Sequence, residues 1–282
     1  MTSNPYQQWI GRTESAQQVI TDTPIQGMQA TLGEFALPLV AAGQVPSLWH
    51  WLYFLERASW QKLAEDGHQQ RGEFLPPVDL PRRMWAGSRV EFHHPLRTGV
   101  AGHRQSKIES IDQKEGKSGR LTFVSVQHEI FCADQLAIKE WQTIVYRDAP
   151  SPDSKPTGKP APESAAFTEM ITPDPLLLFR YSALTFNAHR IHYDRPYATE
   201  TEGYPGLVVH GPLMATLLVN LLTKHYPKRV LTNFEFRGLK PVFDLAPFSV
   251  CANDPDADGT TDLWVADKEG DICVEAKAKL TD

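Results

Sequence analysis

The same order of predicted elements occurs twice in this chain of 282 residues, once on each side of a proline-rich stretch. Residues 21–33 and 172–184 both predict a helix entered through a proline, and these prolines, Pro24 and Pro175, are 151 residues apart. In each copy, a second apolar helix and then a series of strands with alternating apolar residues follow. The sequence therefore predicts two tandem copies of one α+β unit.

The predicted elements can be given by residue range. The first copy has helices over 21–33 and 46–57, a polar loop over 65–81, and strands over 89–96, 104–111, 121–131 and 138–146. The second copy has helices over 172–184 and 211–224, and strands over 230–238, 248–252, 261–266 and 272–280. We interpret each copy as a long helix wrapped by an antiparallel sheet, which is a hotdog unit, and the chain as a double hotdog whose sheets pair edge to edge. The units span residues 1–148 and 167–282, and residues 149–166 are the predicted linker.

Composition excludes several classes of function. A net charge of −6 with scattered lysine and arginine is atypical of a nucleic-acid-binding protein. No apolar run approaches the ~18–20 residues of a membrane-spanning helix, and the N-terminus lacks the order of a signal peptide. Cys132, Cys251 and Cys273 are far apart and predict buried, reduced thiols. We expect a cytoplasmic protein that binds neither nucleic acid nor membrane.

The densest polar stretch of the chain lies in the second copy, just before an apolar helix. Its polar residues are Asn187, His189, Arg190, His192, Tyr193 and Asp194. Gly211 and Pro212 then open the helix, and the free N–H groups of a helix N-terminus bind anions or polarised carbonyls. The matching stretch of the first copy, residues 34–46, has no histidine, asparagine or aspartate. We therefore expect one active site, in the second copy, and a non-catalytic first unit.

This stretch resembles the motif of the MaoC-like, R-specific hotdog hydratases, in which an aspartate and a histidine precede a His-Gly at the start of the hotdog helix. His192 falls on the catalytic histidine and Gly211 on the glycine whose N–H polarises the thioester. Asn187 falls on the catalytic aspartate, which is a departure from the pattern. The segments SALTFNAHRIHYD and EGYPGLVVHGPL are similar to a narrower subgroup, the mesaconyl-C4-CoA (3-methylfumaryl-CoA) or itaconyl-CoA hydratases.

The resemblance implies a hydratase that converts itaconyl-CoA or mesaconyl-C4-CoA to citramalyl-CoA in itaconate or mesaconate breakdown. CoA would be part of the acyl-CoA substrate, and the enzyme would need no separate cofactor and no metal. We predict that His192 moves a proton between water and Cα, Asn187 aims the water, and Gly211 holds the thioester oxygen. We predict that Arg190 pairs with the free carboxylate of the substrate, with His189 and Tyr193 as further substrate contacts.

Several alternatives stay open on sequence alone. A hydroxyacyl-thioester dehydratase of fatty-acyl metabolism is the nearest rival, and Asn187 also allows a non-catalytic acyl-CoA-binding protein. Arg190 could instead be a structural residue, and Asp194 is better explained as a hydrogen-bonding partner than as an acid. His189 and His192 have the spacing of a metal-binding pair, but no third ligand of suitable spacing is evident. A homo-oligomer of double-hotdog chains is also compatible with this fold.

Overall fold

The computed structural model of the protein describes residues 5–37, 43–116, 119–149 and 158–282, and within them one antiparallel sheet of eleven strands. Its order is β1-β3-β4-β5-β2-β8-β11-β10-β9-β7, with β6 beside β11. The first-half strands are β1 (Thr13–Val19), β2 (Arg82–Phe92), β3 (Ala101–Gly116), β4 (Gly119–Cys132) and β5 (Gln135–Arg147). The others are β6 (Lys159–Pro160), β7 (Phe167–Ile171), β8 (Val230–Gly238), β9 (Phe248–Ala252), β10 (Thr260–Ala266) and β11 (Asp271–Thr281).

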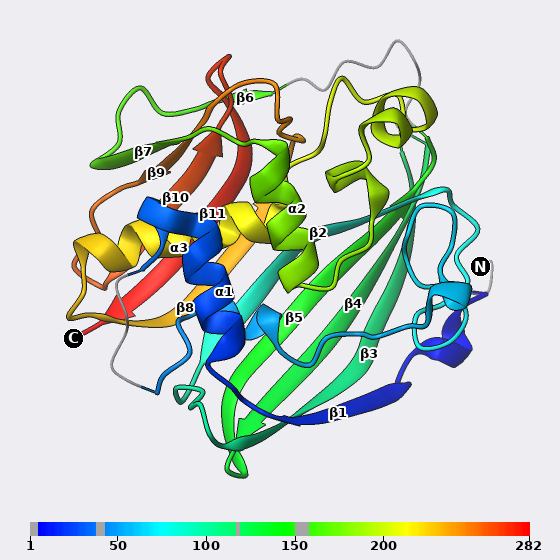
Figure 1. Cartoon of the computed structure of the whole chain (residues 1–282), viewed down its shortest axis with the longest axis horizontal. Coiled ribbons are helices and arrows are strands. Elements are labelled where there is room, and N and C mark those ends of the chain that lie inside the picture. The colour runs from blue at the N-terminus through cyan, green and yellow to red at the C-terminus, as the bar shows by residue number, and fades with distance from the viewer. Residues whose placement is uncertain (1–4, 38–42, 117–118, 150–157) are drawn as a thin grey trace.

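The two halves join where β2 pairs with β8. Ser88 lies opposite Phe236, and Arg89 lies opposite Glu235, in an antiparallel register. This ladder makes a single sheet from the strands of both halves, as the predicted edge-to-edge pairing requires. The helices α1 (Thr23–Leu32), α2 (Pro175–Leu184) and α3 (Gly211–His225) lie on one face of that sheet (Figure 1).

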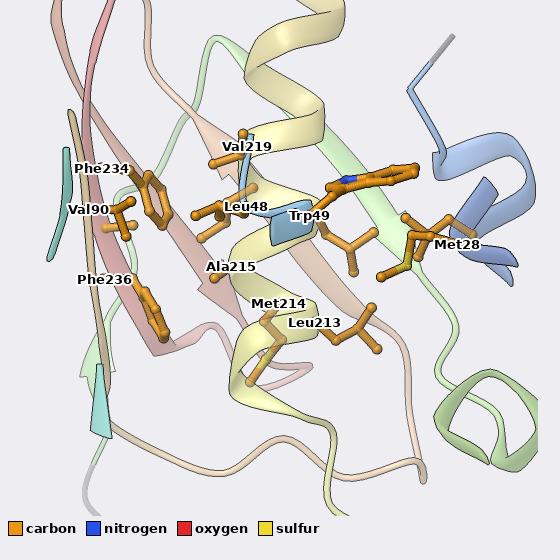
Figure 2. Close-up of a cluster of buried hydrophobic side chains, with 14 of the residues drawn as sticks. Met28, Leu48, Trp49, Val90, Leu213, Met214, Ala215, Val219, Phe234 and Phe236 are labelled. Atoms are coloured by element: carbon orange, nitrogen blue, oxygen red, sulfur yellow. The ribbon is translucent and has the colours of Figure 1, made fainter. Parts of the chain in front are cut away.

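Helix α3 is the core of the second half. Every residue from 213 to 222 is buried, which explains why this segment is apolar on all sides except at Thr216 and Asn220. Val90, Phe234 and Phe236 pack against α3 from the joined strands β2 and β8, and Trp49 lies on its opposite side (Figure 2). In the described part of the chain, no helix has both the length and the apolar character needed to cross a membrane.

The two helices that the sequence placed at equivalent positions, α1 and α2, pack against each other. A Cβ at Gly27 would come within 2.6 Å of the Leu184 side chain, so the glycine permits this close approach. Helix α2 starts at a cap in which Asp174 accepts a hydrogen bond from the Leu177 backbone N–H at 2.8 Å. The offset observed in the sequence thus corresponds to a pair of neighbouring helices.

The predicted helix over 46–57 is wrong. The segment contains a four-residue 3₁₀ turn, Trp49–Leu52, between Leu48 and Phe54, which both have left-handed backbone conformations. The carboxylate of Glu140 on β5 accepts hydrogen bonds from His50 Nε2 at 3.1 Å and Trp51 Nε1 at 3.1 Å. An apolar segment signals burial but does not distinguish a helix from an irregular buried chain, and here these tertiary hydrogen bonds decide.

The remaining predicted elements were found, with the boundaries of the second half closer than those of the first. β8 and β9 match 230–238 and 248–252, whereas β2 starts seven residues before the predicted 89–96. Strands β1, β6 and β7 were not predicted. Of the predicted linker, residues 150–157 lie outside the described residues, and Lys159 and Pro160 pair with β11. This end of the stretch is therefore held against the second half.

Candidate active site

The polar loop begins where α2 ends. Phe186 adopts a left-handed conformation (φ 52°), and the Asn187 backbone N–H donates to the Ser182 carbonyl at 2.8 Å, which reverses the chain. The Asn187 Oδ1 then accepts the backbone N–H of His189 at 3.0 Å. Since a backbone N–H can only donate, it is the amide oxygen of Asn187 that faces it. The amide NH₂ of Asn187 is left to donate to another group.

His192 is fixed at one nitrogen and open at the other. Its Nδ1 donates to the Val208 carbonyl at 2.7 Å, and the Val208 N–H donates back to the Ile191 carbonyl at 3.0 Å. Among the described residues, none forms a hydrogen bond with Nε2. A proton on Nδ1 leaves Nε2 as an unprotonated acceptor, which is the form that a general base needs. The side chain is 8% exposed, so the ring is held almost entirely inside the protein.

The His192 ring lies directly before the N-terminus of α3. It stacks on His210 with ring centroids 3.7 Å apart, and His210 Nε2 hydrogen-bonds to the Ser182 hydroxyl at 2.8 Å. Gly211 follows His210 as the first residue of α3. A Cβ at Gly211 would approach nothing closer than the Trp85 carbonyl at 3.9 Å, so the fold itself does not require a glycine here. The missing side chain instead leaves the first N–H groups of the helix accessible.

Arg190 is engaged within its own loop. Its Nε and Nη2 donate to Asp194 Oδ2 at 2.9 and 2.8 Å, and its guanidinium lies 4.1 Å over the Tyr197 ring. Tyr193 is 40% exposed and donates from its hydroxyl to the Ala188 carbonyl at 2.9 Å. These contacts are those of residues that stabilise the loop, so substrate roles for Arg190 and Tyr193 stay predictions.

The first half contributes a second loop to this site. Gly67 (φ 88°) lies so close that a Cβ would overlap the Ala188 carbonyl, and the Arg190 N–H donates to the Asp66 carbonyl at 2.9 Å. Asp66 accepts two hydrogen bonds from His68, from the backbone N–H and from Nδ1, both at 2.9 Å. The His68 ring lies 4.0 Å from the His189 ring. A unit that we expected to be non-catalytic thus places an Asp–His pair beside the polar loop.

Four histidine rings therefore form a continuous row across the two halves. His68 contacts His189, His189 meets His192 edge to face at 5.4 Å, and His192 stacks on His210. Burial lowers the pKa of His192 to about 4 and holds the pKa of His210 well below its usual value. Burial and the neighbouring histidines lower the pKa of His189. The row is therefore neutral at physiological pH.

Charged side chains face the first-half end of this row. Burial lowers the pKa of His68, and the nearby Arg83 and Arg71 lower it further. Burial opposes ionisation of Asp66, but the hydrogen bonds from His68 hold the pKa of Asp66 below its ordinary value. We therefore assign an ionised Asp66 beside a neutral His68. In the described part of the chain, no carboxylate lies within ion-pair distance of Arg83.

Asp66, His68 and His189 are also the residues that could together approach a metal ion. One donor atom from each lies within 4.8 Å of the others. Two observations argue against a cation here: Asp66 and His68 are hydrogen-bonded to each other, and Arg83 already places a positive charge nearby. A structural zinc site also needs a fourth ligand, and a catalytic one needs three committed ligands. The expectation of a metal-free protein stays a prediction.

The structure brings together His192, Asn187, His189 and the start of α3 at Gly211, four of the residues singled out in the sequence. It adds Asp66 and His68, which sequence reasoning missed, and Arg83, which the sequence did not connect with this loop. Asp66-Gly67-His68 stands in a stretch that was interpreted only as a polar loop. No spacing rule connects it with residues more than 100 positions later, so a local sequence signal for this contact was absent.

Comparisons with known proteins show the family of the chain. Residues 48–244 match the family model described as hydroxyacyl-thioester dehydratase type 2. The chain is 48% identical to mesaconyl-C4-CoA hydratase from Chloroflexus aurantiacus, with 99% of both chains covered. It is 30% identical to the mitochondrial hydroxyacyl-thioester dehydratase type 2 of Schizosaccharomyces pombe, over 87% of this chain and 90% of the relative.

A solved structure from Mycobacterium tuberculosis, described as a double hotdog fold, superimposes with a TM-score of 0.58. The two chains are 14% identical, and 96% of each is covered, so this similarity concerns the fold alone. It confirms the predicted double hotdog. The family model covers more than half of the chain, and the relatives cover nearly all of it. The chain belongs to the hydroxyacyl-thioester dehydratase type 2 family of MaoC-like hotdog proteins.

Proposed function

We propose that this protein is a hydratase that adds water across the double bond of an enoyl-CoA thioester. The observation that carries the proposal is a buried histidine with a free Nε2, stacked on the residue that precedes a glycine-led helix N-terminus. Hydration needs a base for the water and donors for the charge that develops on the thioester oxygen. His192 and the backbone N–H of Gly211 meet these two needs.

The reaction proceeds through one base. His192 Nε2 takes a proton from water as the water oxygen bonds to Cβ, and the electron pair of the double bond shifts towards the thioester. The thioester oxygen then carries negative charge, which the Gly211 N–H and the α3 dipole stabilise. His192 returns its proton to Cα and is neutral again. The NH₂ of Asn187 donates to the attacking water, because the amide oxygen is held by the His189 N–H.

The low pKa of His192 keeps the ring neutral and able to accept a proton, but it also makes the protonated form costly. At neutral pH the ring is neutral and ready to accept a proton. A free imidazolium in this buried position is costly, so its charge has to be balanced by the enolate-like thioester that forms in the same step. Proton transfer to His192 is therefore coupled to substrate binding, which limits proton uptake by the empty site.

We further propose that the substrate is a branched C5 dicarboxylyl-CoA, mesaconyl-C4-CoA or itaconyl-CoA, with citramalyl-CoA as product and no cofactor required. The name of the 48% identical relative supports a mesaconyl-C4-CoA hydratase. Arg83 is a better candidate than Arg190 for the free carboxylate, since Arg190 is paired with Asp194. Arg83 has no such partner among the described residues, and its charge acts on both His68 and His189. Itaconate or mesaconate breakdown in the cytoplasm is the setting that this substrate suggests.

Water addition to three substrates tests the proposal. Purified protein is incubated with mesaconyl-C4-CoA, itaconyl-CoA and crotonyl-CoA, and products are measured by mass. We expect dicarboxylyl substrates to be hydrated with a kcat/KM at least tenfold above that of crotonyl-CoA. Arg83→Met should reduce this preference, whereas Arg89→Met, an exposed arginine on the same strand, should leave it unchanged. Failure to hydrate any of the three would refute the hydratase.

A second candidate function is dehydration of 3-hydroxyacyl thioesters, which is the same chemistry in reverse. The name of the S. pombe relative favours it. The two candidates differ in the acyl chain rather than in the catalytic groups. A kcat/KM for crotonyl-CoA above that for both dicarboxylyl substrates would support the second candidate.

A further inference from the structure

The carboxylate of the polar loop, Asp194, is paired with Arg190, and a second carboxylate approaches the site from the other half of the chain. Asn187 cannot accept a proton from the attacking water, and its amide oxygen is already bonded to the His189 N–H. Asp66 precedes Gly67, whose backbone lies so close to Ala188 that any side chain at position 67 would overlap the Ala188 carbonyl. The contact therefore fixes the Asp66 backbone next to the residue that follows Asn187.

The geometry around Asp66 suits a bound water. Donor or acceptor atoms of Asp66, His68 and His189 lie no more than 4.8 Å from one another. Three atoms within that spacing have a common point no more than about 2.8 Å from each, which is within hydrogen-bond reach. His189 meets His192 edge to face at 5.4 Å, so this point belongs to the same cluster of side chains as the proposed base. Asp66, His68 and Arg71 also line a cavity of about 390 Å³ on the first-half loop.

We propose that Asp66 is a catalytic residue that holds the attacking water, with His68 as the positioning residue that fixes the carboxylate. This inference rests on the proposed hydratase function. Asp66 accepts a hydrogen bond from the water proton that remains on the product hydroxyl, while the other proton passes through His192 to Cα. One O–Cβ bond and one H–Cα bond form, one π bond breaks, and Asp66 ends the cycle still ionised.

The groups facing this pair come from three elements. His68 and Arg71 lie on the same first-half loop as Asp66, Arg83 lies on β2, and His189 lies on the second-half loop. The hydrogen bonds that Asp66 accepts from the backbone N–H and Nδ1 of His68 favour its ionised form. The first half thereby supplies the carboxylate that position 187 lacks.

The test is a rescue experiment on the full chain with mesaconyl-C4-CoA. Asp66→Asn should lower kcat by ~10²-fold or more, within the range of acid–base and positioning groups. Asp79→Asn, an exposed aspartate that lines the same cavity, is the matched control and should stay within threefold of the unaltered protein. The double variant with Asp66→Asn and Asn187→Asp should have a kcat at least tenfold above that of Asp66→Asn alone, since it places a carboxylate at position 187. A residue with a merely structural role would show no such rescue.

The outcomes are separable. If the unaltered protein hydrates the substrate and Asp66→Asn keeps near-normal turnover, the inference is wrong but the hydratase function stands. The same holds if the double variant shows no rescue. Absence of turnover in the unaltered protein refutes the hydratase itself. Loss of turnover after dialysis against a chelator, restored by Zn²⁺, would also overturn the inference, because these side chains would then be metal ligands. Should Asp66→Asn fail to fold, His68→Gln is measured instead, and a kcat within threefold of normal in that variant contradicts the proposal.

Discussion

Each half of the molecule buries two histidines, and His50 of the first half and His192 of the second have different kinds of partner. In the first half, His50 Nε2 bonds to Glu140, whose carboxylate also accepts from Trp51 and from the Ser88 hydroxyl. In the second half, His192 is anchored by Nδ1 alone and keeps Nε2 open. Each ring bonds through one nitrogen, since His50 Nδ1 has no partner among the described residues either. The difference is that His50 is bonded to a buried carboxylate, whereas His192 is bonded to a backbone carbonyl beside the start of α3.

The same contrast holds for the segments that carry these histidines. The second half places a buried helix of fifteen residues, α3, against the sheet. The first half fills the corresponding role with a 3₁₀ turn whose indole and imidazole groups bond to Glu140. A helix leaves free N–H groups at its start. This difference agrees with the prediction of one active site, in the second half.

The largest expected effect comes from His192→Asn. The asparagine NH₂ can still donate to the Val208 carbonyl, but the acceptor at Nε2 is lost. We expect kcat/KM for the preferred enoyl-CoA to fall by ~10³-fold, within the range of a general base, with little change in the melting temperature. Steady-state assays and circular dichroism measure both, and His94→Asn, an exposed histidine, is the control. Near-normal turnover would show that His192 is structural like His50.

Glu140→Ala should give the reverse result. Burial disfavours the charged carboxylate, but hydrogen bonds and charge from His50 hold the pKa of Glu140 at about 2, so it is ionised and paired. Its removal leaves His50 and Trp51 without their partner and should cost about 3–5 kcal/mol of unfolding free energy. Urea unfolding measures this cost. The fraction that remains folded should keep its kcat; a large loss of kcat would mean that the first-half network reaches the reaction.

Acid should weaken both halves by the same mechanism. Burial lowers the pKa of His128 and of His192 to about 4, from 6.5 in an unfolded chain. The unfolded state therefore binds more protons between these values, so stability is fully present above pH 6.5 and falls as the pH drops towards 4. Each group contributes about 3 kcal/mol to this loss. Urea unfolding at several pH values should show a shallower slope in either His128→Gln or His192→Asn than in the unaltered protein.

Asn187→Asp is expected to have the smallest effect. The carboxylate can accept the His189 N–H as the amide oxygen does, so the loop should keep its shape. With Asp66 already present, we expect kcat to change by less than tenfold. A gain of about 10²-fold or more in steady-state assays would mean that the asparagine limits the reaction and that Asp66 does not replace a loop carboxylate.

Local pattern was enough to predict the elements that depend on local chemistry. The start of α3 at Gly211 and the bounds of β8 and β9 follow from glycine, proline and alternating apolar residues. The loop from Asn187 to Asp194 was identified as the site because its residue types are rare together. The helix predicted over 46–57 was wrong because hydrogen bonds to Glu140, which is 89 residues away from Trp51, hold this segment in an irregular conformation. The edge strand β1 was missed for a related reason: it pairs with β3, more than 80 residues later in the chain.

The sequence by itself determined the double α+β unit, the position of the polar loop and the helix N-terminus beside it, because these are set within a few turns of chain. Only the tertiary structure decided which charges are free. It paired Arg190 with Asp194, left Arg83 without an acidic partner among the described residues, and brought Asp66 and His68 against His189. The availability of a charged side chain depends on what lies within a few ångströms of it, and residues from both halves of the chain decide that at this site.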